Sequence, residues 1–282
     1  MAPLYEELKD KMATSILNVE NASKSFQNKR LFHKANFFMQ EGEKVALIGK
    51  NGGGKSTLLR IIAGEEELDE GTVVKKRGLK LAYLPQETRF SEEEEILPAL
   101  CKSFTEEIPE TEKEAMGKRI LQELGFSDFT ISCAKLSGGQ KRKVAIAGVL
   151  AMGPELLILD EPTAGLDPAG RDELFEEIAG LRKNYAMTIL LVSHSMDDVA
   201  RYADEVLVLH QGELKMEGTV EEVFSRKEEL ETMGLGLPQI RALLFDLQKN
   251  GLDIQLGNTV EEAVSALSHY FIEEMRKGVS RA

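Results

Sequence analysis

The sequence has little of what marks secreted, membrane-spanning or nucleic-acid-binding proteins. Its 282 residues include two cysteines, Cys101 and Cys133, which are too few for a disulfide framework and favour a reducing cytosol. It has no uninterrupted run of about 18 apolar residues, so no membrane-spanning helix is expected. The beginning, MAPLYEELKDKM, lacks the basic and apolar sections of a signal peptide. Acidic residues outnumber basic ones, 48 to 35, and the resulting net charge of −13 argues against a broad nucleic-acid surface, so no direct nucleic-acid partner is expected.

The most informative feature that the sequence does contain is a glycine-rich stretch, GKNGGGKST, at residues 49–57. An apolar, strand-like run (VALI, 45–48) precedes it, and LLRIIAG (58–64), with helical spacing, follows it. A strand, a glycine loop and a helix in this order are the context in which such a loop binds nucleotide phosphates. Glycines lack Cβ atoms, so the loop can curl and point N–H groups at phosphate oxygens beside the positive end of the helix dipole.

Two side chains of this loop are candidates for specific contacts. Lys55 can reach the β- and γ-phosphates, and the Ser56 hydroxyl can ligate Mg²⁺. A glycine-rich turn without a ligand is the alternative, but the motifs that follow argue against it. The predicted nucleotide-binding residues of the loop are Gly49, Lys50, Asn51, Gly52, Gly53, Gly54, Lys55, Ser56 and Thr57.

Five further motifs follow in a fixed order: YLPQ ending at Gln86, LSGGQ at 136–140, LLILDEP at 156–162, AGLD at 164–167 and LVSH ending at His194. Alone, each has an ordinary explanation, because a serine in LSGGQ can simply cap a helix and LLILD can be any buried strand. Together they resemble the ATP-binding cassette (ABC) family of ATPases over about residues 16–225. The resemblance implies that ATP is hydrolysed to ADP and phosphate with Mg²⁺ as cofactor.

The resemblance also implies roles for particular residues. Asp160, at the end of a buried strand, would orient the Mg²⁺ shell, and Glu161 would be the general base that polarises the attacking water; a mere neighbour of the metal is the alternative for Glu161. The predicted catalytic residues are Glu161, His194, Lys55 and Gln86, and the predicted Mg²⁺ ligands are Ser56, Gln86 and Asp160. Phe26 stands where the family places an aromatic ring under the adenine, with core packing as the alternative.

A second cassette is implied as a partner. In the family, LSGGQ caps the γ-phosphate of ATP held by another cassette. This assigns Ser137, Gly138, Gly139 and Gln140 to the nucleotide of a partner. Since one set of motifs is present, two chains, like or unlike, would meet head to tail with ATP between them.

The expected fold is α/β: a P-loop ABC cassette with a three-layer core, an antiparallel β subdomain and a helical subdomain, followed by a small helical C-terminal domain. We expect an N-terminal extension at 1–13, with apolar residues spaced as in an amphipathic helix. The ATP-binding domain is expected at 14–225, with its helical subdomain at about 88–135. A helical extension of the dimerisation type is expected at 226–282.

The two halves of the chain resemble different branches of the family. From about residue 138 to 282, including GLGLPQ, NGLD and TVEEAVSAL, the sequence resembles the ATPase subunits of energy-coupling-factor (ECF) transporters. In those importers two cassettes drive a membrane scaffold, and the tail helps the cassettes to pair. The first half, including KSFQNKRLFHKANFF, is more like the soluble F-type ABC proteins, and the segment after Gln86 lacks the ECF-like stretch.

The function expected is therefore the ATP-hydrolysing subunit of an ECF-type importer, cytoplasmic and held at the inner face of the membrane by its scaffold. One alternative is a soluble, F-type-like ATPase acting on the translation machinery, and another is an engineered chimeric cassette without a working membrane partner. A chromosome or repair ATPase is disfavoured, because no sustained heptads lie between Gln86 and Leu136. In ECF transporters the scaffold contacts the groove beside the glutamine loop, and here the segment from Glu87 to Ala134 departs most from the family pattern. We therefore expect weak coupling to an ECF scaffold, with pairing of cassettes and basal ATPase activity retained.

Overall fold

The computed structural model of the chain describes residues 14–26, 29–87, 91, 93–104, 106–185 and 187–279. The amphipathic helix predicted at 1–13 lies outside these residues. The described part contains two β-sheets and the helices that cover them, and no helix within it is long and apolar enough to cross a membrane.

A three-stranded antiparallel sheet has the order β2-β1-β4, and a six-stranded sheet has the order β5-β6-β7-β3-β8-β9. In the larger sheet all neighbouring strands run parallel except β9, which is antiparallel to β8. The strands are β1 (Leu17–Phe26), β2 (Lys29–Met39), β3 (Lys44–Ile48), β4 (Glu70–Lys75), β5 (Leu81–Leu84), β6 (Leu156–Asp160), β7 (Thr188–Val192), β8 (Glu205–His210) and β9 (Glu213–Thr219).

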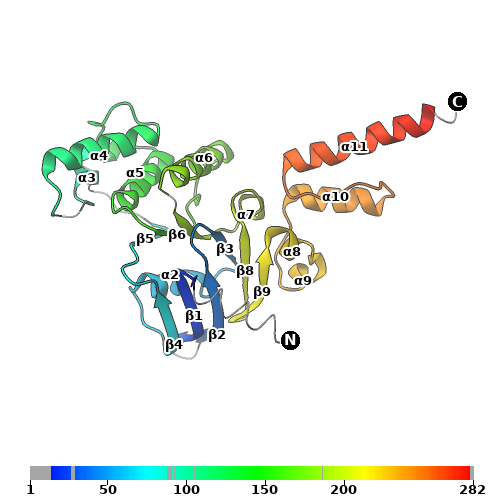
Figure 1. The fold of residues 1–282 in the computed structure, drawn as a ribbon, viewed down its shortest axis with the longest axis horizontal. Coiled ribbons are helices and arrows are strands. Elements are labelled where there is room, and N and C mark those ends of the chain that lie inside the picture. Colours follow the sequence, from blue (N-terminus) through cyan, green and yellow to red (C-terminus); the bar gives the residue numbers. More distant parts are fainter. Residues whose placement is uncertain are drawn as a thin grey trace.

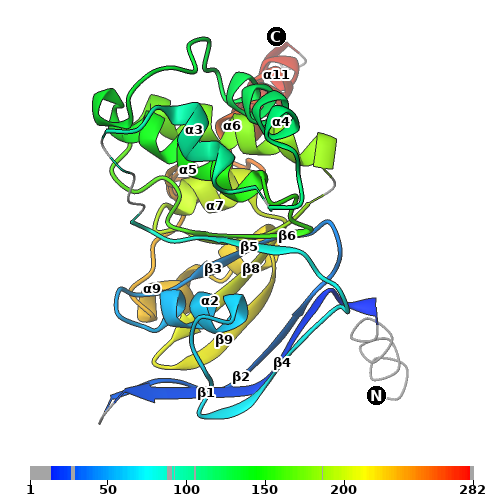
Figure 2. The ribbon, with the colours of Figure 1, turned by 90° about the vertical axis from the view of Figure 1, so that its left-hand side faces the viewer.

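Helices complete the layers. Figure 2 shows α2 (Lys55–Ala63) between the two sheets and α3 to α6 over the opposite face of the larger sheet. The remaining helices are α3 (Ile96–Cys101), α4 (Glu110–Glu123), α5 (Gly138–Leu150), α6 (Pro168–Tyr185), α7 (Met196–Tyr202), α8 (Val220–Phe224), α9 (Lys227–Thr232), α10 (Gln239–Lys249) and α11 (Val260–Val279). Two apolar clusters fill the space above and below the larger sheet. The predicted cassette architecture is confirmed.

The central strands determine where the functional residues lie. In β6 and β7 every residue is buried, because helices or strands cover both faces of the sheet. This burial explains the continuous apolar runs LLIL and ILLV. Parallel strands end at the same edge of the sheet, so β3, β6 and β7 deliver the glycine loop, Asp160 and His194 to one place.

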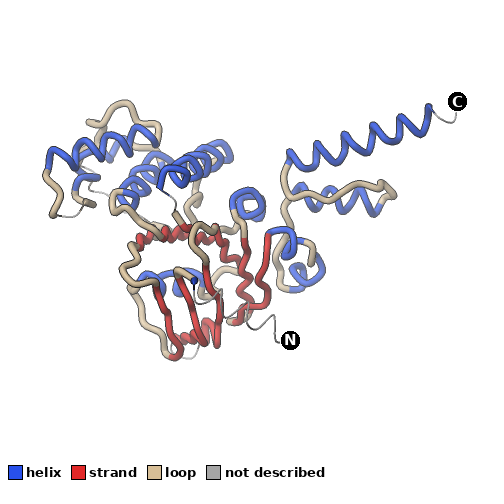
Figure 3. Tube along the Cα trace, viewed as in Figure 1, coloured by secondary structure: helices blue, strands red, loops and turns tan. Residues whose placement is uncertain are grey.

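The C-terminal helices separate into two parts. Leu230 of α9 is fully buried in the core of the cassette, whereas α10 and α11 form a hairpin with its own small core around Leu244, Ile254 and Ala263. The hairpin projects away from the sheets (Figure 1). Figure 3 shows that it is joined to the body by a non-helical segment. The domain boundary at 225/226 stays a prediction, and the independently packed part begins near Gln239.

Polar contacts fasten this hairpin to the cassette. Arg241 of α10 is 1% exposed and binds both carboxylate oxygens of Glu221 on α8, at 2.6 and 2.7 Å. It also donates to Asn258 Oδ1 at 2.8 Å, just before α11. The backbone N–H of Gln239 donates to Asp197 on α7, close to the strand end that carries His194. The hairpin is therefore held against α7 and α8 by charged and polar partners.

Candidate active site

The glycine loop after β3 is shaped by close contact with neighbouring strands. A Cβ on Gly49 would lie 2.2 Å from the carbonyl oxygen of Leu209, and one on Gly54 would lie 3.1 Å from Leu31. Gly54 also has a φ of 96°, in the left-handed region that favours glycine. It precedes α2, whose N-terminus has no side-chain cap. The first N–H groups of α2 are therefore suited to an anionic ligand.

Lys55, the first residue of α2, is buried with its ammonium on the loop's own backbone. Its Nζ donates to the carbonyl oxygens of Gly49 at 2.7 Å and Lys50 at 3.1 Å. Burial lowers the pKa of Lys55, against the opposing negative charges of Glu161 and Asp160. Among the residues that the structure describes, no carboxylate forms an ion pair with Lys55. A buried cation in this position favours binding of an anion such as a phosphate.

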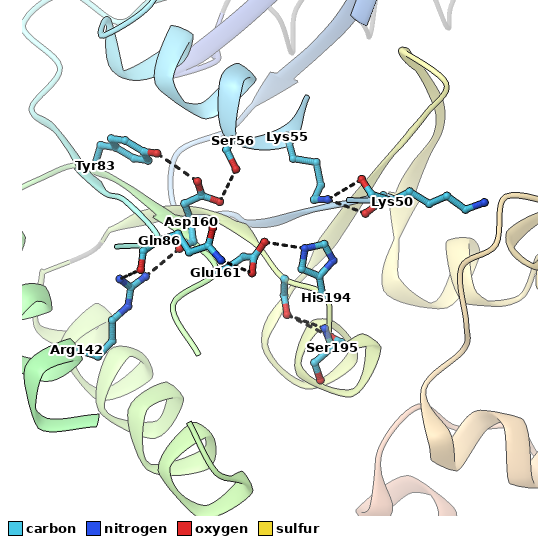
Figure 4. Close-up of polar contacts among 12 residues, drawn as sticks. Lys50, Lys55, Ser56, Tyr83, Gln86, Arg142, Asp160, Glu161, His194 and Ser195 are labelled. Carbon is cyan, nitrogen blue, oxygen red and sulfur yellow. Dashed lines mark hydrogen bonds and ion pairs between the residues drawn. The ribbon is translucent and has the colours of Figure 1, made fainter. Parts of the chain in front are cut away.

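Asp160 lies beside the same helix. Its carboxylate accepts hydrogen bonds from Ser56 Oγ at 3.2 Å and from the Tyr83 hydroxyl at 3.3 Å (Figure 4). Burial raises the pKa of Asp160, and the hydrogen bond from Ser56 opposes this. The adjacent hydroxyl and carboxylate are hard oxygen donors, and Mg²⁺ in nucleotide sites commonly takes one or two such ligands in addition to phosphate oxygens. These two of the three predicted ligands therefore fit the metal. The amide nitrogen of the third, Gln86, donates to Glu161, and its role as a ligand stays a prediction.

Glu161 is held through both of its carboxylate oxygens. Oε1 lies 2.7 Å from His194 Nε2, and Oε2 accepts a hydrogen bond from Gln86 Nε2 at 3.2 Å (Figure 4). Its φ of 47° is a left-handed conformation that side-chain-bearing residues seldom adopt. Such strained residues often occur at functional sites, and the strained residue here is the one that contacts both His194 and Gln86.

Lys55, Ser56, Glu161 and His194 line one cavity of about 460 Å³, and Asp160 adjoins it through its hydrogen bond with Ser56. Phe26, at its rim, is 43% exposed, which does not fit the alternative of core packing. Its role under an adenine ring stays a prediction. The side chain of Lys50 points away from the cavity (Figure 4) and lies against Gly234 before the hairpin. The predicted nucleotide contact of Lys50 stays a prediction. The cavity is lined by Phe26, Lys29, Leu31, Asn51, Gly52, Gly54, Lys55, Ser56, Thr57, Gln86, Glu161 and His194.

LSGGQ lies elsewhere, as predicted for a motif that serves a different nucleotide. It lines a separate hollow of about 760 Å³ together with Asp167 and Gly170. Ser137 and Gln140 form a capping box at the start of α5, so the ordinary capping explanation also holds for these two side chains. In a single chain, the glycine loop is therefore not completed by LSGGQ.

Tyr83 was not among the predicted site residues. It belongs to β5, which pairs in parallel with β6, and this pairing brings the Tyr83 hydroxyl to Asp160. The YLPQ motif was the signal in the sequence, but only its glutamine was given a role. The pairing of β5 with β6 could not be read from residues 77 positions apart.

Comparisons with known proteins agree on the kind of protein. The family model described as "ABC transporter" matches residues 32–164. The energy-coupling factor transporter ATP-binding protein EcfA2 of Clostridium tetani is 40% identical over 282 residues, covering 90% of this chain and 97% of that protein. The protein of the same name from Clostridium perfringens is 39% identical, covering 89% and 96%.

Two solved structures are similar. One is cbiO1 from Clostridium perfringens, part of the ABC transporter complex cbiONQ, with 30% identity, a TM-score of 0.68 and coverage of 82% of this chain and 99% of that chain. The other is MJ1267, an ATP-binding cassette of an ABC transporter, with 26% identity, a TM-score of 0.71 and coverage of 79% and 99%. The likeness to the Clostridium tetani protein spans both halves of this chain, so the mosaic of ECF-like and F-type halves has no support.

Proposed function

This chain is an ATPase of the ABC transporter family and belongs with the energy-coupling factor transporter ATP-binding proteins, and from that premise we propose how its site works and what it assembles with. It binds MgATP in the cavity behind the glycine loop and hydrolyses it when a second cassette completes the site. The observation that carries this is the cluster of Glu161, His194 and Gln86 directly beside Ser56 and Asp160.

Each group has a task that its position allows. Lys55 and the N–H groups of the loop hold the β- and γ-phosphates, and Phe26 supports the base. Mg²⁺, held by Ser56 and Asp160, would neutralise phosphate charge and orient the leaving oxygens. Glu161 accepts a proton from the attacking water, a role that typically supplies about 10²–10⁴-fold in rate.

His194 and Gln86 keep the base in place. A carboxylate fixed through both oxygens does not need to reorganise when water arrives, which is the advantage of a preorganised site. His194 lines the cavity together with Glu161, so it can also contact the terminal phosphate. Gln86 is at the start of the segment that leads to the helical subdomain, and its side chain contacts Glu161. A movement of this segment would therefore displace Glu161 directly.

A membrane partner is proposed at the groove beside Gln86. This groove, of about 400 Å³, is lined mainly by apolar side chains, including Leu84, Leu100 and Val149. Met152 at its edge is 49% exposed. The expectation of weak coupling to an ECF scaffold rested on the divergent segment from Glu87 to Ala134 and remains untested. We place a helix of an importer's scaffold in this groove, which holds the chain at the cytoplasmic face of the membrane.

The hairpin is proposed to pair with the hairpin of a second cassette. Val260, Val264, Phe271 and Met275 of α11 are each more than half exposed and recur at spacings of four and seven residues. This is the spacing of a stripe on one helix face, suited to packing against another helix.

Two experiments test the proposal. The purified chain should release phosphate from ATP only with Mg²⁺, and EDTA should abolish the release. Tagged chain expressed in a bacterial host with an ECF scaffold should be recovered from the detergent-solubilised membrane fraction together with that scaffold. Recovery with ribosomes instead would favour the translation-associated alternative and overturn the transport role.

A further inference from the structure

A buried arginine, Arg142, lies in α5 behind the site and has no part in the roles described so far. It is 6% exposed and donates four hydrogen bonds, all to backbone carbonyl oxygens. Its Nη1 donates to Pro85 at 2.7 Å and to Gln86 at 3.1 Å. Its Nη2 donates to Asp160 at 2.9 Å and its Nε to Pro162 at 3.0 Å. Figure 4 shows the guanidinium beneath Gln86 and Asp160.

The choice of partners is unusual for a buried charge. A second buried arginine, Arg241, is neutralised by the carboxylate of Glu221. Within the described part of the chain, Arg142 has no carboxylate partner at ion-pair distance. Burial lowers the pKa of Arg142 to about 10, so it is still charged near neutral pH. Burying a charge without an ion pair is unfavourable, so packing alone does not account for an arginine here.

The four carbonyls belong to two segments that meet at the base. Pro85 and Gln86 follow β5, whereas Asp160 and Pro162 flank Glu161 at the end of β6. The side chains of Gln86 and Glu161 contact each other at 3.2 Å. A planar guanidinium presents its N–H donors in fixed directions. Because it binds carbonyl oxygens of both segments, it sets the distance between the backbone at Gln86 and the backbone at Glu161.

Arg142 also lies on the same helix as LSGGQ. Ser137 caps the start of α5, and Arg142 follows five residues later, about 7.5 Å along the axis. The capping box holds this first turn in a regular conformation. A shift of α5 at Ser137 therefore moves Arg142 with it.

We propose that Arg142 is a positioning residue that links LSGGQ to the hydrolytic groups of its own chain. When Ser137 engages the nucleotide of a partner cassette, α5 is fixed, and Arg142 then fixes the Gln86 loop and the Asp160–Pro162 segment around Glu161. The two sites of a pair are thereby made interdependent. This inference rests on the proposed function of the site.

The test compares Arg142→Met, Arg142→Lys and a matched control, Lys143→Met. Lys143 is the next residue of α5 and is also buried, but it forms ion pairs with Glu173 and Glu177 on α6 instead. Each variant is measured for kcat and KM with MgATP, and for affinity for a fluorescent ATP analogue. The third measurement is the requirement for Mg²⁺. A non-hydrolysable ATP analogue should raise the unfolding temperature when Mg²⁺ is present, and the Mg²⁺ concentration that gives half of this rise is determined for each variant.

Arg142→Met should lower kcat by about 10²-fold, the loss expected for a misplacement of about 1 Å. Its affinity for the analogue should stay within roughly three-fold, since no phosphate contact is removed, and its Mg²⁺ requirement should rise by about ten-fold because Asp160 is less well placed. Arg142→Lys keeps the charge but has no planar fork, so kcat should be intermediate. Lys143→Met should lower the unfolding temperature while kcat changes by no more than about two-fold.

The outcomes separate the two proposals. A wild-type chain that does not hydrolyse ATP would overturn the proposed function. An active wild type combined with an unchanged kcat and Mg²⁺ requirement in Arg142→Met would overturn the role of Arg142 alone. So would equal losses of kcat in Arg142→Met and Lys143→Met, because general loosening of α5 would then explain both. If Arg142→Met does not fold, the kcat and Mg²⁺ requirement of Arg142→Lys decide the question.

Discussion

Replacing Glu161 with glutamine should remove hydrolysis and leave ATP binding intact. Glutamine has the same shape as glutamate, and both contacts of the native side chain can be kept. Its amide oxygen can accept from Gln86 at the present 3.2 Å, and its amide N–H can donate to His194, now at 2.7 Å from the carboxylate. The strained backbone at φ 47° is equally compatible with either residue. The substitution therefore removes basicity and little else.

The expected loss of kcat is that of removing the general base alone, because the substitution changes the basicity of the side chain and keeps its shape and contacts. Loss of a positioned general base lowers kcat by about 10²–10⁴-fold, which corresponds to about 2.7–5.4 kcal/mol of transition-state stabilisation. The assay is phosphate release under saturating MgATP, alongside titration with a fluorescent ATP analogue and size-exclusion chromatography. Because ATP binds without being consumed, the variant should elute as an ATP-dependent dimer.

The control is Glu176→Gln on α6, where the carboxylate is 69% exposed and does not line the cavity. This variant should match the wild type in rate and affinity. If Glu161→Gln hydrolysed ATP at a near-normal rate, Glu161 would not be the base. If it lost ATP affinity as well, the substitution would have disturbed the site and the reasoning above would fail.

Two further predictions concern binding and attachment. Lys55→Ala deletes the charge that faces the phosphates, so affinity for ATP should fall by about 10- to 100-fold in a fluorescent titration; unchanged affinity would place the nucleotide elsewhere. The hydrogen bond from Arg241 lowers the pKa of Glu221, so this contact stabilises the folded state above the ordinary glutamate pKa and is lost as pH falls through the lowered one. The protection factors of amides in α10, which are exchange rates corrected for the intrinsic effect of pH, should accordingly fall in acid, whereas Glu221→Gln should show low protection already at neutral pH.

Much of the site could be predicted because each motif follows its own strand directly. The glycine loop follows β3, Asp160 ends β6, and His194 comes two residues after β7. The carboxyl ends of parallel strands meet at one edge, so these positions at strand ends, together with the resemblance to the ABC family, were enough to assign the groups to one site.

Contacts between segments that are distant in the sequence could not be predicted, because no short-range pattern indicates them. The hydrogen bonds of Arg142 depend on where α5 packs against the end of β6 and the Gln86 loop. Arg142 looks like one of several basic residues in KRK, where a charge is normally solvated. The direction of Lys50, away from the cavity, is likewise set by the neighbouring segment at Gly234 and by nothing local.

The central claim is that the site of one chain is completed by LSGGQ of another, and mixing two inactive variants tests it most directly. Ser137→Arg places bulk and positive charge at the predicted contact, so this variant alone should bind ATP without turnover. Glu161→Gln alone should also be inactive. In a mixed pair, the intact glycine loop and Glu161 of the first variant meet the intact LSGGQ of the second, so one complete site is restored. The link through Arg142 is not engaged in the first variant, because its own LSGGQ is blocked, so this site should work more slowly than a wild-type site. The account predicts that the mixture releases phosphate faster than either variant alone; a mixture as inactive as its two components would contradict it.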